Sequence, residues 1–221
     1  MTTDPREIIR AVLRDSKAPC ITSSFQADCV ALLKMVVEEA PDIPVLFLET
    51  GYHFPETYAY RDQMAELLHL NLINVSAKMT VAEQESKFGI LNQTAPDKCC
   101  AIRKVEPLFS SLEPYDTWFT ALRREQSPTR ANLQHVEEFR LPSGKNIRKV
   151  SPIAEWTWPE VWKFVKGEGL PFLPLYEQGY TSIGCQPCTA RPADADNLRS
   201  GRWGGRKLEC GIHIQAGEQH A

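Results

Sequence analysis

The sequence predicts an α/β fold, a mostly parallel sheet with helices on both faces, and three observations support this. Short apolar runs alternate with longer helical patterns over residues 18–77. Such alternation is typical of parallel strands joined by helices. The length of 221 residues fits one medium domain with a sizeable core. The composition, 43% apolar and 24% charged, is that of a globular protein.

The first elements follow one another closely along the chain. Asp4 and Pro5 are a suitable N-cap and first helical residue for an N-terminal helix. Three strand patterns and two helix patterns come next. The strands are "APCITSS" (18–24), "IPVLFLET" (43–50) and "NLINVSA" (71–77), and the helices are "ADCVALLKMVVEEA" (27–40) and "PETYAYRDQMAELLHL" (55–70).

The second half of the chain has weaker patterns. Residues 157–169 predict a helix capped by Thr157, with Glu160 three residues on and Gly167 near its end. Beyond Tyr180 the chain is rich in Cys, Arg, Gly and Pro, and we expect a functional loop region there. We therefore expect a single domain over 1–221, with 181–221 as a C-terminal loop and tail. Further strands are expected at 117–122, 133–140 and 146–151.

The charge and the N-terminus exclude several classes of protein. With 25 basic and 28 acidic residues, the net charge of -3 argues against a general nucleic-acid or membrane-surface binder. The polar N-terminus lacks the apolar core of a signal peptide, and no apolar run is long enough to span a bilayer. We expect a cytoplasmic protein with no nucleic-acid or membrane partner. The sequence leaves homo-oligomerisation open.

Two loops fall where open parallel sheets bind ligands, beyond the carboxyl ends of the strands. "SSFQAD" (23–28) follows the first strand, and its hydroxyls and amides can face an anionic group. "ETGYHFPET" (49–57) follows the second strand, with Pro55 placed to open the next helix. The first loop lacks the glycines of a Walker loop or dinucleotide fingerprint, so it is a weak signal by itself.

Seven cysteines in a reducing compartment indicate metal binding, catalysis or simple burial rather than disulfides. Cys20 and Cys29 lie in apolar runs and are expected in the core. The adjacent pair in "DKCCAIRKVEP" (97–107) and the C-x-x-C of "IGCQPC" (183–188) supply four thiolates, enough for a zinc ion or a cluster. Adjacent thiols strain a single zinc site, whereas a cubane offers separate irons, so we favour [4Fe–4S]. These four residues are Cys99, Cys100, Cys185 and Cys188.

The remaining cysteine, Cys210, lies in "GRKLECGIH" near Arg206 and Lys207. Cations lower a thiol pKa and favour the nucleophilic thiolate, whereas Glu209 has the opposite effect. From its neighbours alone, an inert cysteine on a frayed tail is the favoured reading. Further cations in "LRSGRW" (198–203) and "RREQSPTR" (123–130) suit a phosphate- or sulfate-bearing small molecule, although any one of them can be a solvated surface residue.

Taken together, the motifs resemble one family. "KCCAIRKVEP", "IGCQPC" and "ECGIH" resemble the cysteine signatures of assimilatory adenylyl-sulfate reductases, within the wider PAPS reductase family. "SSFQAD" and "ETGYHFPET" are similar to that family's modified phosphate loop and following strand-turn. The resemblance covers about residues 18–214, and it makes Cys210 the strongest single candidate.

The resemblance implies a fold and a reaction. The fold would be the adenine-nucleotide hydrolase-like α/β fold. The reaction would be the thioredoxin-dependent reduction of adenylyl sulfate to sulfite and AMP, a step of sulfate assimilation toward cysteine. Cys210 would attack the sulfur and form an S-sulfonate, which a thioredoxin thiol would resolve. Because the chain ends at Ala221, we expect the reductant to be a separate protein.

The resemblance also implies residue roles, by position in the family's motifs. Cys210 would be the catalytic nucleophile. The phosphosulfate would be surrounded by Lys104, Arg199, Arg202 and His213. The nucleotide would be held by Ser24, Leu48 and Arg130. A [4Fe–4S] cluster that never changes redox state would be held by Cys99, Cys100, Cys185 and Cys188. Lys104, one turn beyond the first cysteine pair on the same helix, would carry the cluster's influence to the substrate.

Three alternatives stay open. A reductase of 3′-phosphoadenylyl sulfate, or one with dual specificity, shares "ECGIH", although that branch lacks the two cysteine pairs. An ATP-dependent tRNA-thiolating enzyme would need a glycine-rich "SGGxDS"-type loop and a more basic surface. A zinc-binding interaction module would explain four cysteines but neither Cys210 nor the cations.

Overall fold

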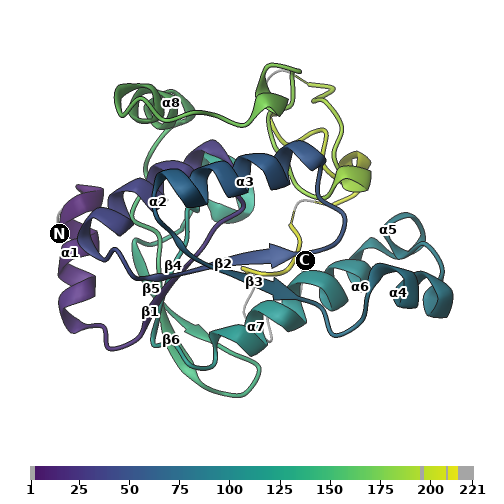
Figure 1. Ribbon diagram of the computed structural model, residues 1–221, viewed down its shortest axis with the longest axis horizontal. Coiled ribbons are helices and arrows are strands. Elements are labelled where there is room, and N and C mark those ends of the chain that lie inside the picture. The colour runs from purple at the N-terminus through teal and green to yellow at the C-terminus, as the bar shows by residue number, and fades with distance from the viewer. Residues whose placement is uncertain (1–2, 195–196, 208, 214–221) are drawn as a thin grey trace.

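The computed structural model describes residues 3–194, 197–207 and 209–213. Within them, helices and strands alternate as expected through the first half of the chain (Figure 1). The Asp4 side chain accepts a hydrogen bond from the Arg6 amide and caps the first helix. In order, these elements are α1 (Pro5–Asp15), β1 (Pro19–Thr22), α2 (Ala27–Glu39), β2 (Pro44–Glu49), α3 (Pro55–Leu67) and β3 (Asn71–Ser76).

A helical run that the sequence pattern did not predict in full follows β3. It includes a π-helical turn, η1, between two α-helical segments, so the chain stays helical from residue 96 to 112. The run consists of α4 (Val81–Phe88), α5 (Leu91–Thr94), α6 (Pro96–Cys100), η1 (Ala101–Val105) and α7 (Glu106–Leu112).

The later elements confirm the expected strands and helix, with shorter bounds. The strand expected from residue 133 begins only at Val136. Thr157 and Glu160 form the expected capping box of the last α-helix. These elements are β4 (Thr117–Phe119), β5 (Val136–Arg140), β6 (Asn146–Val150) and α8 (Trp158–Gly167). Short 3₁₀ turns occur at Arg124–Gln126, Pro128–Arg130, Pro174–Tyr176, Gln186–Cys188 and Trp203–Gly205.

One sheet joins the six described strands in the order β3-β2-β1-β4-β6-β5. All neighbours are parallel except β5 and β6, which pair antiparallel. The chain runs from β1 toward one edge and then returns from β4 toward the other edge. This reversal opens a crevice at the carboxyl ends of β1 and β4, the usual ligand site of such sheets.

Two apolar cores confirm that helices cover both faces of the sheet. Ile21 and Phe47 pack with α1, α2, α3 and α8 on one face. Cys20, Leu46 and Trp118, displaced by one residue along the strands, pack with α7 on the other. Figure 1 shows α2 and α3 above the sheet and α7 below it. The alternation follows from the two-residue period of a strand.

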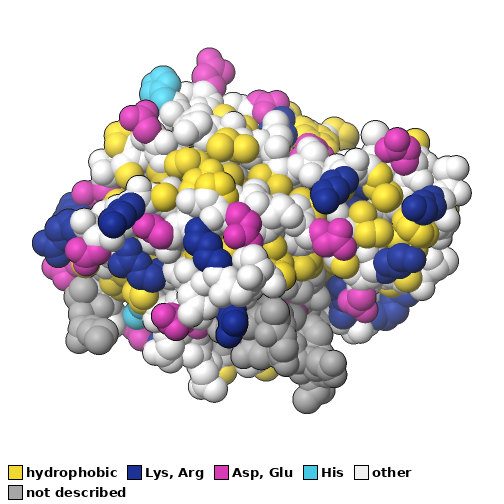
Figure 2. Space-filling model, turned by 90° about the horizontal axis from the view of Figure 1, so that it is seen from below, with side chains coloured by type: hydrophobic (Ala, Val, Ile, Leu, Met, Phe, Trp, Pro, Cys, Tyr) yellow, Lys and Arg dark blue, Asp and Glu magenta, His cyan; other side chains and the backbone are white. Residues whose placement is uncertain are grey.

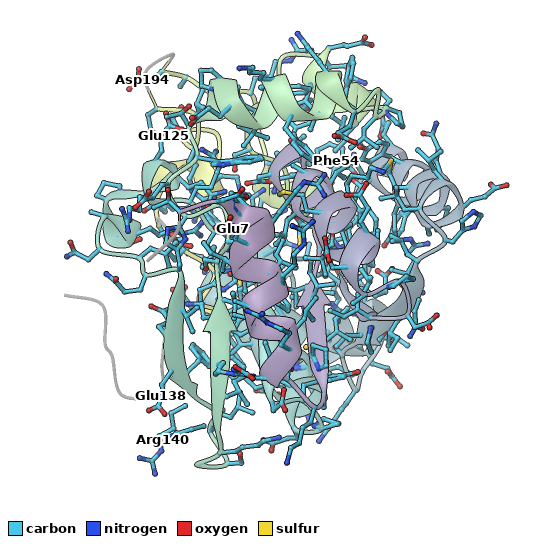
Figure 3. All side chains as sticks on the ribbon, turned by 90° about the vertical axis from the view of Figure 1, so that its left-hand side faces the viewer. Glu7, Phe54, Glu125, Glu138, Arg140 and Asp194 are labelled. Carbon is cyan, nitrogen blue, oxygen red and sulfur yellow. The ribbon has the colours of Figure 1, made fainter. Side chains whose placement is uncertain are left out.

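Charged side chains are scattered over the surface of the molecule. On the edge strand β5, Glu138 and Arg140 are exposed and project outward (Figure 3), which disfavours edge-to-edge pairing. Basic and acidic side chains are interspersed over the face shown in Figure 2. No helix in the described ranges combines the length and apolar character that a membrane span requires.

Candidate active site

An open cavity of about 960 Å³ lies at the carboxyl ends of β1, β2 and β4. Ser23 follows β1 and Thr120 follows β4, so the cavity lies at the reversal of strand order. Described residues of the segments 182–184, 199–203 and 209–213 complete its wall beside the end of β2, drawn in yellow-green in Figure 1. The cavity brings together the proposed nucleophile and all seven predicted substrate residues: Cys210, Lys104, Arg199, Arg202, His213, Ser24, Leu48 and Arg130.

The "SSFQAD" turn contributes to the lining of this cavity. Phe25 is fully buried and has a φ of 57°, a left-handed conformation that costs energy for a residue with a side chain and is frequent at functional sites. Ser24 is exposed, with its Oγ 3.3 Å from Cys29 Sγ. Gln26 accepts a hydrogen bond from the Ile183 amide at 2.7 Å. The turn is therefore held to the segment that carries the second cysteine pair.

The turn after β2 adds a neutral histidine that the sequence reasoning did not single out. His53 Nε2 lies 2.8 Å from the Leu48 carbonyl oxygen in a hydrogen bond, and its ring packs on Phe47. Burial lowers the pKa of His53 to about 4, despite that hydrogen bond. Leu48, expected at the nucleotide, thus lines the cavity beside an uncharged imidazole.

A second, smaller cavity is lined by all four cysteines of the two pairs: Cys99, Cys100, Cys185 and Cys188. The first pair comes from the end of α6 and the second from the loop at residues 185–188. The π-helical turn begins directly after Cys100, and such turns occur often at functional sites. The sequence spacing alone could not show that residues 85 positions apart would meet, but the structure brings them together.

The four thiols differ in their electrostatic surroundings. Burial raises the pKa of Cys99 to about 11, with a further contribution from Cys100. Burial also acts to raise the pKa of Cys185, but the positive charge of Lys104 and a hydrogen bond with Thr50 outweigh it, so this pKa is lowered. The Cys185 Sγ and Thr50 Oγ1 atoms are 3.3 Å apart.

The donor set fits an all-sulfur cluster. Four thiols converge on one cavity, and thiolates are the ligands of iron–sulfur clusters and of structural zinc. Among the described residues, no three His, Cys, Asp or Glu side chains are close enough together to hold a metal ion. The thiols are thus arranged around a cavity rather than closed on one point.

Lys104 lines both cavities, as does Trp203. Burial acts to lower the Lys104 pKa, but electrostatic interactions with Cys185, Cys210 and Cys100 outweigh burial and raise it. Lys104 is therefore a protonated ammonium between the cysteine cavity and the open cavity. Its place in the helical run 96–112, one turn after the cysteine pair, is as expected.

Arg103 and Gln84 are supporting residues that sequence reasoning missed. The Arg103 guanidinium is buried and donates to the Thr50 carbonyl and to Gln84 Oε1, the latter at 3.1 Å. Gln84 Nε2 in turn lies 3.8 Å from Cys99 Sγ. Arg103 follows the cysteine pair and could be recognised only as a cation, because nothing local signals its burial.

Arg202 and Arg199 enter the open cavity from the loop 198–203. Arg202 is buried and packs directly on Gly184, where a Cβ atom would lie within 2.2 Å of its guanidinium. Gly201 is equally constrained, because a Cβ there would lie 2.0 Å from the Ala190 carbonyl oxygen. Burial lowers the pKa of both arginines, and Arg130 adds to the effect at Arg199. These two glycines bring the arginine loop against the loop of the second cysteine pair.

The C-terminal segment places Cys210 in the open cavity, where it is half-buried. His213 stacks on Trp118 with ring centroids 5.3 Å apart. Burial, with the nearby Lys149, Arg130 and Arg199, lowers the His213 pKa well below its usual value. His213 is therefore a neutral group beside the cations.

Arg130, one of the residues predicted to hold the nucleotide, pairs with an acidic residue that the sequence did not lead us to expect. Its guanidinium forms a paired contact with Glu209, Nε to Oε1 at 2.9 Å and Nη2 to Oε2 at 2.6 Å. Sequence reasoning noted Glu209 only as a charge next to Cys210. Leu208, between the cations and this pair, lies outside the described residues.

A parallel α/β sheet with a cation-lined cavity at its strand reversal, and a cysteine inside that cavity, is typical of an enzyme that acts on a phosphorylated small molecule. Comparisons with known proteins are more specific. Residues 18–191 match the phosphoadenosine phosphosulfate reductase domain. The chain belongs to this family.

Individual relatives agree with this assignment. The chain is 44% identical over 198 residues to a phosphoadenosine 5′-phosphosulfate reductase of Gloeobacter violaceus, covering 87% of this chain and 81% of the relative. It is also 44% identical to an adenosine 5′-phosphosulfate reductase of Streptomyces coelicolor, covering 88% and 81%. The solved phosphoadenylyl-sulfate reductase of Candida auris shares the fold, with a TM-score of 0.72 at 23% identity over 85% of this chain and 90% of that one.

Proposed function

We propose that this protein reduces adenylyl sulfate to sulfite and AMP, with Cys210 as nucleophile and a separate thioredoxin as reductant. One observation carries the proposal above the others. Cys210 shares a single cavity with Lys104, Arg199 and Arg202, at the strand reversal where an α/β sheet binds its ligand. Family membership and relatives that are named reductases of adenosine phosphosulfates support the same reaction.

The attack of Cys210 on the substrate requires positive charge in the cavity. A thiolate and a phosphosulfate are both anionic, so fixed positive charge must offset their repulsion and stabilise the departing phosphate. Lys104 lines both the cavity that holds Cys210 and the cysteine cavity, and Lys104 and Arg202 each interact electrostatically with Cys210. Buried guanidinium groups are suited to the two oxygens of a phosphate or sulfate.

The bonds change in two stages. The Cys210 thiolate attacks the sulfur of adenylyl sulfate; an S–S bond forms, the S–O bond to the phosphate breaks, and AMP leaves with the electron pair. A thioredoxin thiolate then attacks Cys210 Sγ, and sulfite leaves with the electrons of that S–S bond. The second thioredoxin thiol breaks the resulting mixed disulfide. The dithiol has then supplied two electrons, and Cys210 is again a thiol.

Nucleotide contacts are proposed for Ser24, Leu48 and Arg130, which line the same cavity. His213 would contribute as a neutral group, because its pKa is lowered well below its usual value. Cys99, Cys100, Cys185 and Cys188 would hold a [4Fe–4S] cluster, whose chemistry there would be electrostatic. Lys104, between the two cavities, is the residue placed to respond to it.

Intact-protein mass spectrometry tests the proposal. Anaerobically purified protein is incubated with adenylyl sulfate and no reductant, and we expect a mass increase of one SO₃ group per chain. Cys210→Ser should show no increase, whereas Cys20→Ala, a matched loss of a buried core thiol, should behave as wild type. No adduct in protein with full iron and sulfide content would contradict the proposal.

The 3′-phosphorylated substrate is the second candidate, because a relative named for it is as similar as one named for the unphosphorylated form. The two cysteine pairs favour adenylyl sulfate. Incubating equal concentrations of each nucleotide in separate reactions decides between them. We expect faster adduct formation from adenylyl sulfate, and faster formation from the 3′-phosphorylated nucleotide would reverse the assignment.

A further inference from the structure

Glu209, the residue before Cys210, is itself fixed in the fold. Its carboxylate receives the paired Arg130 contact described above and a hydrogen bond from Thr129 Oγ1 at 3.2 Å. Arg199 Nη2 lies 3.9 Å from Glu209 Oε2. The Glu209 and Arg130 side chains are only 7% and 11% exposed, so solvent screens this ion pair poorly.

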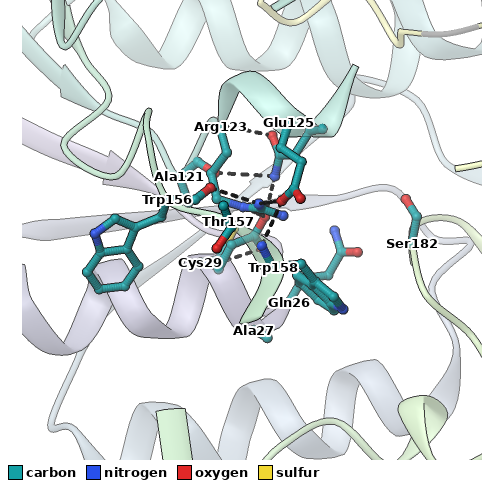
Figure 4. A network of polar contacts seen from close by, with 12 residues as sticks. Gln26, Ala27, Cys29, Ala121, Arg123, Glu125, Trp156, Thr157, Trp158 and Ser182 are labelled. Carbon is teal, nitrogen blue, oxygen red and sulfur yellow. Dashed lines mark hydrogen bonds and ion pairs between the residues drawn. The ribbon is translucent and has the colours of Figure 1, made fainter. Parts of the chain in front are cut away.

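The Arg130 side of this contact is held by further hydrogen bonds. Arg130 Nη1 donates to Gln126 Oε1, which also accepts from the Arg123 amide at 3.0 Å. Arg123 donates to the Trp156 carbonyl at 3.1 Å and to Glu125 Oε2 at 2.7 Å (Figure 4). All three nitrogen atoms of the Arg130 guanidinium thus donate hydrogen bonds to protein groups. Glu125 in the same loop accepts a hydrogen bond from the amide of Trp158, the first residue of α8.

The residues after Cys210 are fixed at a second place. Ile212 packs against the core on the α7 face of the sheet. Lys149 Nζ donates to the His213 carbonyl at 3.4 Å, while the His213 ring stacks on Trp118. Gly211 has a φ of +93°, and a Cβ there would lie 3.3 Å from Val105 Cγ2. Cys210 is therefore held between two attachments, Glu209 on one side and residues 212–213 on the other.

We propose that Glu209 is a positioning residue whose pairing with Arg130 seats Cys210 in the cavity. This inference rests on the proposed function, because it concerns the nucleophile of that reaction. A thiol on an unanchored segment samples many positions relative to the substrate's sulfur atom. Small errors in the position of Cys210 Sγ strongly slow its attack on that sulfur. The pair also gives Arg130 a role beside its proposed contact with the nucleotide.

The variant that separates these roles is Glu209→Gln, which keeps the shape of the side chain and removes its charge. At saturating adenylyl sulfate, we expect the first-order rate of S-sulfonate formation to fall about 10- to 100-fold, as for a misplaced reacting group. The Kd for AMP, measured by calorimetry, should stay within about threefold of wild type, because only orientation changes. Glu66→Gln, an exposed acid on α3, is the matched control.

Two further variants test the pairing itself. Glu209→Asp keeps the charge and should recover part of the lost rate. Arg130→Gln should lower both the sulfonation rate and the affinity for AMP. The double variant should be no slower than the slower single variant, because residues that act as a pair are not additive. A sulfonation rate for Glu209→Gln equal to wild type, or full additivity in the double variant, would overturn the inference.

Hydrogen exchange gives a readout that does not depend on activity. In substrate-free holoprotein, we expect the amides of residues 209–213 to exchange about tenfold faster in Glu209→Gln, since hydrogen bonds to charged groups are among the stronger ones. Unchanged exchange would also overturn the inference. If wild type forms no S-sulfonate but Glu209→Gln still speeds hydrogen exchange at residues 209–213, the proposed function fails. The inference that the Arg130–Glu209 pair fixes this segment then stands.

Discussion

Lys104→Gln tests how much a single cation of the open cavity contributes to turnover. Lys104 lines both the cysteine cavity and the open cavity, and its interactions with Cys185, Cys210 and Cys100 outweigh burial and raise its pKa. Glutamine is of similar length and can still donate a hydrogen bond, so the change removes the charge more than the shape. The rate of this variant therefore measures how much the one charge contributes to S-sulfonate formation.

The magnitude follows from the position of the charge. Two unit charges 4 Å apart interact by about 4 kcal/mol at the effective dielectric constant of a protein surface. Loss of a single preorganised donor to a developing oxyanion costs about 2.7–4 kcal/mol, or about 10²–10³ in rate. We therefore expect S-sulfonate formation to slow about 10²- to 10³-fold.

The assay is rapid-quench mass spectrometry of a single turnover at saturating adenylyl sulfate. Lys166→Gln, an exposed lysine on α8, is the matched control and should match wild type. Iron and sulfide are measured on every variant, so that a change in the cysteine cavity is recognised. A Lys104→Gln rate within about threefold of wild type, far below the loss expected for a charge at the reacting group, would refute the reasoning.

Three further predictions concern the cluster, the core and pH. Cys99→Ser should lose most of its iron and acid-labile sulfide, since one of four thiolate ligands is removed; full content would show that Cys99 is not a ligand. Ile21→Ala, at a fully buried site on β1, should lower the free energy of unfolding by about 2–5 kcal/mol in urea, and a loss below about 1 kcal/mol would contradict the packing described. Burial lowers the pKa of His53 to about 4 from 6.5. Between these values the unfolded chain binds more protons, so stability should fall as pH decreases from about 6.5 to 4. Urea midpoints across this range should fall less steeply in His53→Leu; equal slopes would contradict the assignment.

The arrangement of the first half of the fold could be predicted because its signals are local. Apolar runs of strand length and capped helices determine β1 to β3 and the helices between them without reference to distant residues. The helices of 81–112 have weaker patterns, because α5 and α6 are only four and five residues long. The π-helical turn at Ala101–Val105 has no sequence signature that distinguishes it from an α-helix.

The site was predictable where its residues carry chemistry in a recognisable motif. The four paired cysteines line one cavity and Cys210 lines the other, while their roles as cluster ligands and nucleophile stay predictions. Glu209 and Arg103 were not predictable, because a charged residue has the same appearance in sequence whether it is solvated or buried. The Arg130–Glu209 contact joins residues 79 positions apart. Only the folded chain shows that this acid binds a cation of the cavity.

The measurement that tests the central claim most directly is peptide mapping of the sulfonated protein. Wild type is loaded with adenylyl sulfate in the absence of thioredoxin, digested at low pH to limit exchange between thiols, and sequenced by tandem mass spectrometry. The account predicts one SO₃ group, carried by Cys210 alone among the seven cysteines, and its release as sulfite when thioredoxin is added. An SO₃ group on any other cysteine, or none in protein with a full complement of iron and sulfide, would contradict it.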